Sequence, residues 1–271
     1  MISASRGNAV VKMSKVKTTW QRVRDQVVHD YRSAEAESTG RLGAFEWGAL
    51  LVTTLGLVVM NFGGTPAVFV AFAELTGVVP SAYWELGHLV FWVGACVLGY
   101  VVVPVIFLLV MKRNIGDYYI NPRGFSAHLW PYLALFIPAS ALVYWVSFWP
   151  EFQAIYPFYT LAGRSWFDLI MWELAYGVQF LALEFFFRGF LLESLRKALG
   201  MGAIAIMLIP YCMIHFPKTA AESLGSVVAG LLLGYLAMRG RSIWGGVLLH
   251  WLIAIEMDVL SLMQQGALPR L

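Results

Sequence analysis

Long apolar segments separated by short polar connections make up most of the chain after its first 43 residues. A helix of about 17–25 apolar residues crosses the hydrocarbon core of a bilayer, and seven segments approach or reach this length. The predicted spans are Ala44–Gly64, Leu86–Met111, Trp130–Trp149, Trp166–Phe187, Met201–Phe216, Ser223–Met238 and Ile243–Met263. The fifth and sixth are the shortest. The pattern predicts an all-α protein, a polytopic membrane helical bundle of about seven transmembrane helices.

One further apolar segment does not fit the pattern of a span. Thr65–Val79 contains Pro66 and Glu74, and we interpret it as an interfacial or re-entrant piece. The chain then divides into an N-terminal arm (1–43), a first group of transmembrane helices (44–165), a second group (166–263) and a C-terminal tail (264–271).

Composition supports a membrane protein and excludes several other classes. Hydrophobic residues make up 59% of the chain and charged residues only 13%, whereas a soluble domain has about 25% charged residues. The same composition excludes a disordered chain, a secreted disulfide scaffold and a nucleic-acid-binding protein. The two cysteines, Cys96 and Cys212, lie inside apolar segments, where they act as small hydrophobic side chains. The first 43 residues contain no continuous apolar run, so no signal peptide is predicted.

The positions of Lys and Arg predict the orientation of the bundle. The segments before, between and after the spans hold 8, 0, 3, 1, 2, 1, 2 and 1 of them, with Arg188 counted separately at the end of the fourth helix, so basic connections alternate strictly with others. Basic connections of membrane proteins face the cytoplasm. We therefore expect a cytoplasmic N-terminus and a C-terminus on the opposite side of the membrane.

The N-terminal arm has the spacing of an amphipathic helix. Its apolar residues recur every three or four positions, at Met13, Val16, Trp20, Val23 and Val27. The basic residues Lys12, Lys15, Lys17, Arg22 and Arg24 fill positions between them. This pattern is typical of a basic helix lying on an anionic cytoplasmic leaflet. A solvated helix or an unstructured tail is the alternative.

Ionisable side chains inside the predicted spans are the strongest functional signal, because a charge within a membrane is costly. The informative residues are Glu173, Glu184, Arg188, His215, His250, Glu256 and Asp258. Glu184 and Arg188 stand four residues apart and can pair across one helical turn. The helical rise of about 1.5 Å per residue places Glu184 about 18 Å from Arg196, His215 about 22 Å from Gly200 and His250 about 14 Å from Arg241. Three helices thus bring a carboxylate and two imidazoles to a similar depth.

Such a set permits more than one chemistry. Glu184 can act as a general base on water, with His215 and His250 orienting that water or stabilising an oxyanion. Two histidines and a glutamate can also hold a catalytic zinc ion. Either route hydrolyses a peptide bond inside the membrane. The remaining alternative is that the three side chains only satisfy one another in the core of the bundle.

Small residues predict where two helices approach closely. Ser226, Gly230 and Gly234 recur every four residues on the sixth span. Such a stripe lets another helix pack against the backbone.

Three short motifs in residues 166–263 resemble those of the CPBP family, the CAAX proteases and bacteriocin-processing enzymes also called Abi. Leu183–Gly189, with the sequence LEFFFRG, resembles a motif of two adjacent Glu followed by Arg. Tyr211–His215 resembles an aromatic residue followed by His, and Ser242–His250 resembles the motif with the last His. The resemblance implies a membrane-embedded protease that opens toward the cytoplasm. It matches Glu184 to the second Glu, Arg188 to the Arg, and His215 and His250 to the two histidines.

Two positions depart from the family pattern. Leu183 stands where the first Glu is expected, and Ala254 stands where an Asn or Asp follows the last His. Glu184 would then act alone, or Glu173 or Asp258 would substitute from a neighbouring turn. The resemblance implies intramembrane proteolysis of a membrane-anchored or C-terminal-signal-bearing protein or peptide. It leaves a metal-free glutamic mechanism and a zinc-dependent one open, with a catalytically inactive scaffold or immunity protein as the alternative.

The catalytic residues expected from this resemblance are Glu184, His215, His250 and Arg188. A divalent metal, if one is used, would be held by Glu184, His215 and His250. The expected partners are a membrane-anchored substrate and membrane lipid, without nucleic acid. The expected location is the inner, cytoplasmic membrane of a bacterium.

Overall fold

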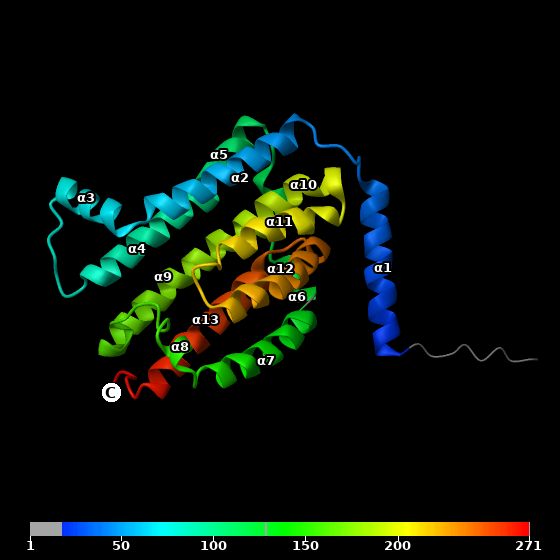
Figure 1. Cartoon of the computed structure of the whole chain (residues 1–271). Helices are drawn as coiled ribbons and strands as arrows, with labels where there is room; N and C mark the ends of the chain where they lie inside the picture. Colours follow the sequence, from blue (N-terminus) through cyan, green and yellow to red (C-terminus); the bar gives the residue numbers. More distant parts are fainter. Residues whose placement is uncertain (1–17, 128, 271) are drawn as a thin grey trace, which may run out of the picture.

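The chain is represented by a computed structural model that describes residues 18–127 and 129–270. Within these ranges the chain forms helices and contains no strand. Figure 1 shows a bundle of long helices running in nearly the same direction, with α1 (Thr19–Glu37) at one end of it. The predicted all-α fold is therefore confirmed. Residues 1–17, which include Met13, Val16 and three of the lysines of the predicted amphipathic arm, lie outside the described residues.

Six helices in the described ranges are long and apolar enough to cross a membrane. They are α2 (Ala44–Gly63); the continuous helix α4 (Trp84–Val97), η1 (Leu98–Val102) and α5 (Val103–Val110); α7 (Leu129–Val146); the continuous helix α9 (Trp166–Glu184), η4 (Phe185–Leu191) and α10 (Leu192–Leu199); α12 (Ala220–Gly240); and α13 (Trp244–Gln264). Two shorter apolar helices are α3 (Pro66–Thr76) and α11 (Gly202–Met213). The chain is thus a polytopic helical membrane protein, as predicted.

Short helical turns complete the described part of the chain. They are η2 (Ile115–Asp117), α6 (Arg123–Ala127), α8 (Pro150–Gln153) and η3 (Ala162–Arg164). The elements η1 and η4 are π-helical turns inside long helices. Such turns are rare and often occur at functional sites.

Three helix lengths differ from the sequence prediction. The fifth predicted span is the 12-residue helix α11, which is not among the six helices long enough to cross a membrane in the described ranges. The fourth long helix continues to Leu199 and is 34 residues long, because beyond the apolar stretch Arg196 pairs with Glu193 at 2.8 Å and keeps polar side chains satisfied on the helix. The sixth is not short. It has 21 residues and begins at Ala220, where the Thr219 hydroxyl accepts a hydrogen bond from the Glu222 amide and caps the first turn.

The segment Thr65–Val79 forms the short helix α3 at the end of the bundle opposite α1 (Figure 1). Pro66 occupies the first turn, where its missing amide hydrogen costs nothing. Gly77 adopts a φ of +75° and ends the helix. Leu75 is 87% exposed. The helix has 11 residues, too few to cross a bilayer.

The basic connections gather at the end of the bundle that carries α1. Ion pairs there join Arg196 to Glu37, Arg239 to Asp30 and Arg241 to Glu193, at 3.5, 3.8 and 3.5 Å. We call this the basic end. The C-terminus lies at the opposite end (Figure 1). The helix α1 and the C-terminus thus lie at opposite ends of the bundle (Figure 1), and the side of the membrane that each end faces stays a prediction.

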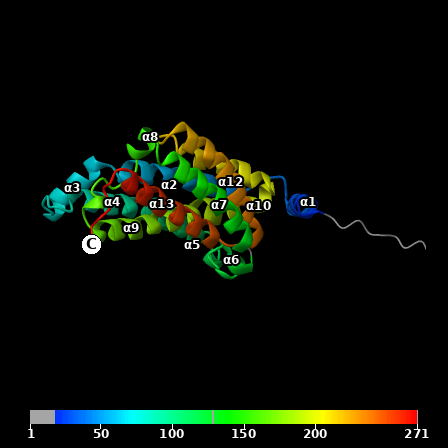
Figure 2. The same cartoon turned by 90° about the horizontal axis from the view of Figure 1, so that it is seen from below.

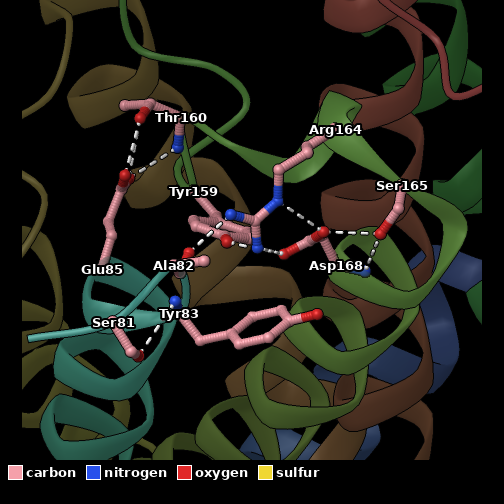
Figure 3. Close-up of polar contacts among 9 residues, drawn as sticks. All are labelled: Ser81, Ala82, Tyr83, Glu85, Tyr159, Thr160, Arg164, Ser165 and Asp168. Atoms are coloured by element: carbon pink, nitrogen blue, oxygen red, sulfur yellow. Dashed lines mark hydrogen bonds and ion pairs between the residues drawn. The ribbon is translucent and has the colours of Figure 1, made fainter.

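A polar cluster fixes the beginning of α9 at the end opposite the basic end (Figure 3). Arg164 donates two hydrogen bonds to the buried Asp168 carboxylate and one to the carbonyl oxygen of Ala82. The Tyr159 hydroxyl also donates to Asp168, at 2.8 Å. The Arg164 guanidinium lies 4.7 Å from the centre of the Tyr83 ring. These bonds tie the start of α9 to the loop before α4.

The centre of the core surrounds η4. Phe186, Phe187 and Phe190 of this turn are fully buried, and the Phe186 ring stacks on Tyr100 of η1. Deep burial of consecutive aromatic residues locks the rotation of this helix. The fixed rotation also sets the directions of the side chains in η4 and in the last turn of α9.

Candidate active site

Glu184 is the last residue of α9, and Arg188 lies in the π-helical turn that follows. Both side chains are enclosed by protein, with exposed fractions of 0%. The Nη1 atom of Arg188 lies 3.2 Å from the Oε1 atom of Glu184. A buried carboxylate without a positive partner would be strongly destabilising. Arg188 therefore provides the compensating charge for Glu184.

His250 of α13 contacts the same carboxylate oxygen. Its Nδ1 atom lies 2.8 Å from Glu184 Oε1, and its side chain keeps an exposed fraction of 17%. The ring also stacks on Phe180, with 5.6 Å between ring centres. One turn before His250, Gly246 faces Glu184, and a Cβ atom at this position would collide with the carboxylate. The missing side chain of Gly246 lets α13 approach the acid closely.

Tyr211 of α11 completes the connection between the three helices. Its buried hydroxyl lies 2.9 Å from His250 Nε2, and its ring lies under the Arg188 guanidinium at 3.9 Å. Gly230 of α12 faces the Tyr211 ring, with only 3.0 Å between a Cβ built there and the ring edge. The predicted close approach at the small-residue stripe of α12 is thus confirmed, and α11 is the helix that packs there.

We assign the tautomers of both imidazoles from the groups that they face. The Glu184 carboxylate can only accept, so we assign the hydrogen of His250 to Nδ1, and Nε2 then accepts from the Tyr211 hydroxyl. His215 follows α11, and its Nδ1 donates to the backbone carbonyl of Tyr211 at 2.8 Å. The Nε2 atoms of both rings are therefore the positions that can accept a proton.

The structure brings Glu184, Arg188 and His250 into direct contact, whereas His215 contacts Tyr211 and not Glu184. Its ring centre is 5.0 Å from that of Tyr211, and within the described ranges no ion pair joins it to Glu184. Tyr211 thus lies between the two histidines and contacts both of them.

The two positions that depart from the family pattern are occupied by buried apolar side chains. Leu183 is 5% exposed and packs in the central apolar cluster that contains Phe187. Ala254 is also 5% exposed and belongs to a second cluster with Trp172 and Tyr176. Neither position offers a polar group to Glu184 or His250.

Glu173 and Asp258 lie together in a separate polar group. Asp258 is fully buried and accepts a hydrogen bond from the Trp172 indole at 2.8 Å. Glu173 lies near enough to Asp258 for the two carboxyl groups to influence each other, but neither of its oxygens makes a hydrogen bond within the described residues. Glu256 accepts a hydrogen bond from Ser140 at 2.6 Å. In the described ranges none of these three acids bonds to Glu184 or His250, so no neighbouring carboxylate takes the place vacated at Leu183.

The donor set does not fit a zinc ion in this arrangement. A catalytic zinc needs three protein ligands around one point. No group of three or more His, Cys, Asp or Glu side chains suited to a metal occurs in residues 18–127 and 129–270. The Oε1 atom of Glu184 already faces Arg188 and His250. We therefore derive no catalytic step through a metal.

Sequence reasoning did not identify the roles of Tyr211 and Gly246, although both carry a usable signal. Tyr211 precedes His215 by four residues and Gly246 precedes His250 by four, so each shares a helix face with a predicted site histidine. A residue four positions before a site histidine lies on the same helix face, so its hydroxyl group or its missing side chain affects the same site.

Comparison with known proteins found a family model that matches part of the chain. No curated protein and no solved structure matched the chain. Residues 164–255, which contain all four predicted site residues, match the family model described as type II CAAX prenyl endopeptidase Rce1-like. This match and the motifs around Glu184, His215 and His250 support membership of the CPBP family of CAAX proteases.

Proposed function

We propose that the protein is an intramembrane peptidase that hydrolyses a peptide bond in a membrane-anchored protein or peptide. The contact between His250 Nδ1 and Glu184 Oε1 at 2.8 Å carries the proposal. A carboxylate that holds one nitrogen of an imidazole fixes the tautomer and leaves the other nitrogen available as a base. The family match supports the reaction type.

The enclosure of the acid assigns its role. Glu184 is 0% exposed and its charge is compensated by Arg188, whereas His250 is partly exposed. A general base must come within hydrogen-bond reach of the proton that it removes. We therefore assign proton transfer to His250 Nε2, with Glu184 orienting the ring and stabilising the imidazolium that forms.

The reaction then runs in two proton transfers. When the substrate is bound, the Tyr211 hydroxyl donates to the carbonyl oxygen of the scissile bond instead of to His250 Nε2. The freed lone pair of Nε2 takes a proton from a water molecule while the water oxygen attacks the carbonyl carbon. The Tyr211 hydroxyl then stabilises the oxyanion of the tetrahedral intermediate. The intermediate collapses when Nε2 returns the proton to the leaving amide nitrogen, and this step breaks the C–N bond.

His215 is assigned a positioning role in this scheme. Its Nδ1 hydrogen is held by the Tyr211 carbonyl, so Nε2 is an acceptor for the second hydrogen of the attacking water.

The site is proposed to open toward the basic end, which we place in the cytoplasm. We place the protein in the inner membrane of a bacterium, as the resemblance to bacterial processing enzymes implies.

A second candidate function is that of a catalytically inactive relative that acts as a membrane scaffold or immunity protein. The burial of Leu183 in the apolar core favours this candidate, because no carboxylate faces the site from that position. In that case the contacts among Glu184, Arg188 and His250 only hold α9 and α13 together.

The two candidates differ in what happens to other membrane proteins. We would map the chain termini of all membrane proteins in cells that lack the gene and in cells that carry it. A peptidase predicts at least one protein with an uncut terminus in the deletion strain. Its termini return to normal on expression of the wild type and stay uncut with His250→Ala at equal abundance. Identical terminus maps in both strains would support the scaffold.

A further inference from the structure

The helix α1 is attached to the bundle by polar contacts. Asp30 accepts a hydrogen bond from the Tyr235 hydroxyl of α12 at 2.7 Å, and Arg239 lies 3.8 Å from the same carboxylate oxygen. Near the end of α1, Glu35 accepts from the backbone amide of Met201, and Glu37 pairs with Arg196. Partial burial of Asp30 opposes its charge, but hydrogen bonds from Tyr235 and Gln26 and the charge of Arg239 lower the pKa of the carboxyl below its usual value.

A different side of α1 is apolar and uncovered. Trp20, Val23, Val27 and Tyr31 follow one another at spacings of three or four residues and form one helix face. Their side chains are 77%, 50%, 39% and 53% exposed, and none of the residues of α1 is buried. We call these four residues the apolar stripe. Asp30 lies about 60° to one side of the centre of the stripe and Glu35 about 75° to the other. The exposed fractions show that the bundle does not cover the stripe between these contacts.

The side of α1 opposite the stripe is charged. Arg22, Asp25, His29 and Arg32 are spaced by three or four residues and lie about 180° from the stripe. The helix therefore has an apolar face, which is flanked by the residues that contact the bundle, and a charged face opposite it. This division is typical of a helix that lies in the plane of a membrane surface.

The direction of α1 fits the same location. Figure 1 shows that α1 does not continue along α2 but crosses the end of the bundle. Figure 2 shows α1 end-on while the long helices are seen lengthwise, so its axis is steeply inclined to theirs. A helix at this angle, placed at the end of transmembrane helices, runs along the membrane surface and not through it.

The lipid-facing surface of the bundle begins beside α1. Six residues, Ser38–Gly43, separate α1 from α2, and on the first two turns of α2 Trp47 and Leu51 are 57% and 70% exposed. Trp and Tyr prefer the headgroup region of a bilayer, and the stripe carries one of each. The 43 residues of the arm also contain eight Lys and Arg residues, which attract an anionic leaflet.

We propose that α1 lies on the lipid surface at the basic end of the bundle, with the apolar stripe inserted between headgroups and acyl chains. The contacts of Asp30 and Glu37 with α12 and α10 then hold the helix at the rim of the bundle. This proposal is independent of peptide hydrolysis and applies equally to an active peptidase and to a scaffold.

Spin labels on the full-length protein test the proposal. In a background with Cys96→Ala and Cys212→Ser, single cysteines are introduced by Val23→Cys and Val27→Cys on the stripe, and by His29→Cys and Arg32→Cys on the charged side as matched controls. Each labelled protein is reconstituted in vesicles of phosphatidylcholine and phosphatidylglycerol. Collision of the label with oxygen, which dissolves in lipid, is compared with collision with a water-soluble nickel chelate.

We expect a higher oxygen-to-nickel collision ratio at both stripe positions than at both control positions. The ratio at Val23→Cys should fall when Trp20→Glu is added, because a charge on the stripe opposes insertion. Equal ratios at all four positions would overturn the proposal in favour of a solvated helix. Stripe labels shielded from both oxygen and nickel would overturn it in favour of a second copy or another protein covering the stripe.

Discussion

The Nδ1 atom of His250 lies 2.8 Å from the Oε1 atom of Glu184, and this contact joins α13 to α9 in the interior of the bundle. Arg188 faces the same oxygen from the following turn. The Glu184 Oε1 atom therefore contacts both the Arg188 guanidinium and the His250 imidazole, whose other nitrogen faces Tyr211. The proposed chemistry and the packing of three helices depend on the same few atoms. Variants must therefore distinguish an effect on catalysis from an effect on stability.

Tyr211→Phe removes only the hydroxyl and keeps the ring under Arg188. If this hydroxyl donates to the oxyanion, the processing rate should fall about 10²–10³-fold, as for other oxyanion donors, with unchanged protein abundance. If the hydroxyl only donates a hydrogen bond to His250, its removal should lower the processing rate by roughly tenfold at most. The measurement is the rate of appearance of the processed substrate. Wild-type rates with Tyr211→Phe would remove the hydroxyl from the mechanism.

Gly246→Ala places a methyl group against the Glu184 carboxylate. We expect loss of activity and a lower unfolding temperature, because neither the acid nor the backbone of α13 can move without breaking the contact with His250. Gly225→Ala is the matched control, since nothing lies within 4 Å of a Cβ at that position in the described part of the chain. Thermal unfolding in detergent and the activity assay should separate the two variants. Equal behaviour would contradict the close approach of α13.

Arg188→Met removes the positive partner of a fully buried carboxylate. The free energy of unfolding should fall by about 3–5 kcal/mol, because an uncompensated charge remains in the interior. Adding Glu184→Gln removes that charge and should recover part of the loss. Chemical denaturation of the two single variants and the double variant measures this coupling. Strictly additive losses would show that the two side chains do not compensate each other.

The sequence predicted the helical class because hydropathy is a local property of the chain. The pairing of Glu184 with Arg188 follows from their spacing alone. The length of the fourth helix was predicted too short because hydropathy ends near Phe187, while ion pairing between Glu193 and Arg196 extends the helix. Ion pairs between side chains are not visible to a hydropathy pattern.

The contacts between helices could not be predicted in detail. The helical rise predicted that Glu184, His215 and His250 lie at a similar depth in the membrane. The rotation of each helix about its axis decides which of these side chains are in contact. The aromatic core of η4 sets that rotation for Glu184, and the last turn of α11 turns His215 toward Tyr211 instead of the acid. The role of Tyr211 depends on both rotations, so spacing within α11 alone did not reveal it.

Removal of metal ions gives a further prediction. Because the described side chains offer no group of three donors suited to a metal, activity should persist after treatment with a strong chelator and removal of the chelate. Processing is measured before and after treatment, and again after zinc is added. Loss of activity on chelation with recovery on zinc addition would contradict the assignment of proton transfer to the Glu184–His250 pair alone.

The most direct test of the account is the replacement of Glu184 by Gln, which keeps the shape of the side chain and removes its charge. Glu173→Gln is the matched control, because this acid lies on the same helix but interacts with Asp258 and not with the site. Cells that carry each variant at equal abundance are assayed for accumulation of the uncut membrane-anchored precursor. We predict that Glu184→Gln slows processing about 10²–10⁴-fold while Glu173→Gln stays near the wild-type rate. Normal processing by Glu184→Gln would contradict the central claim.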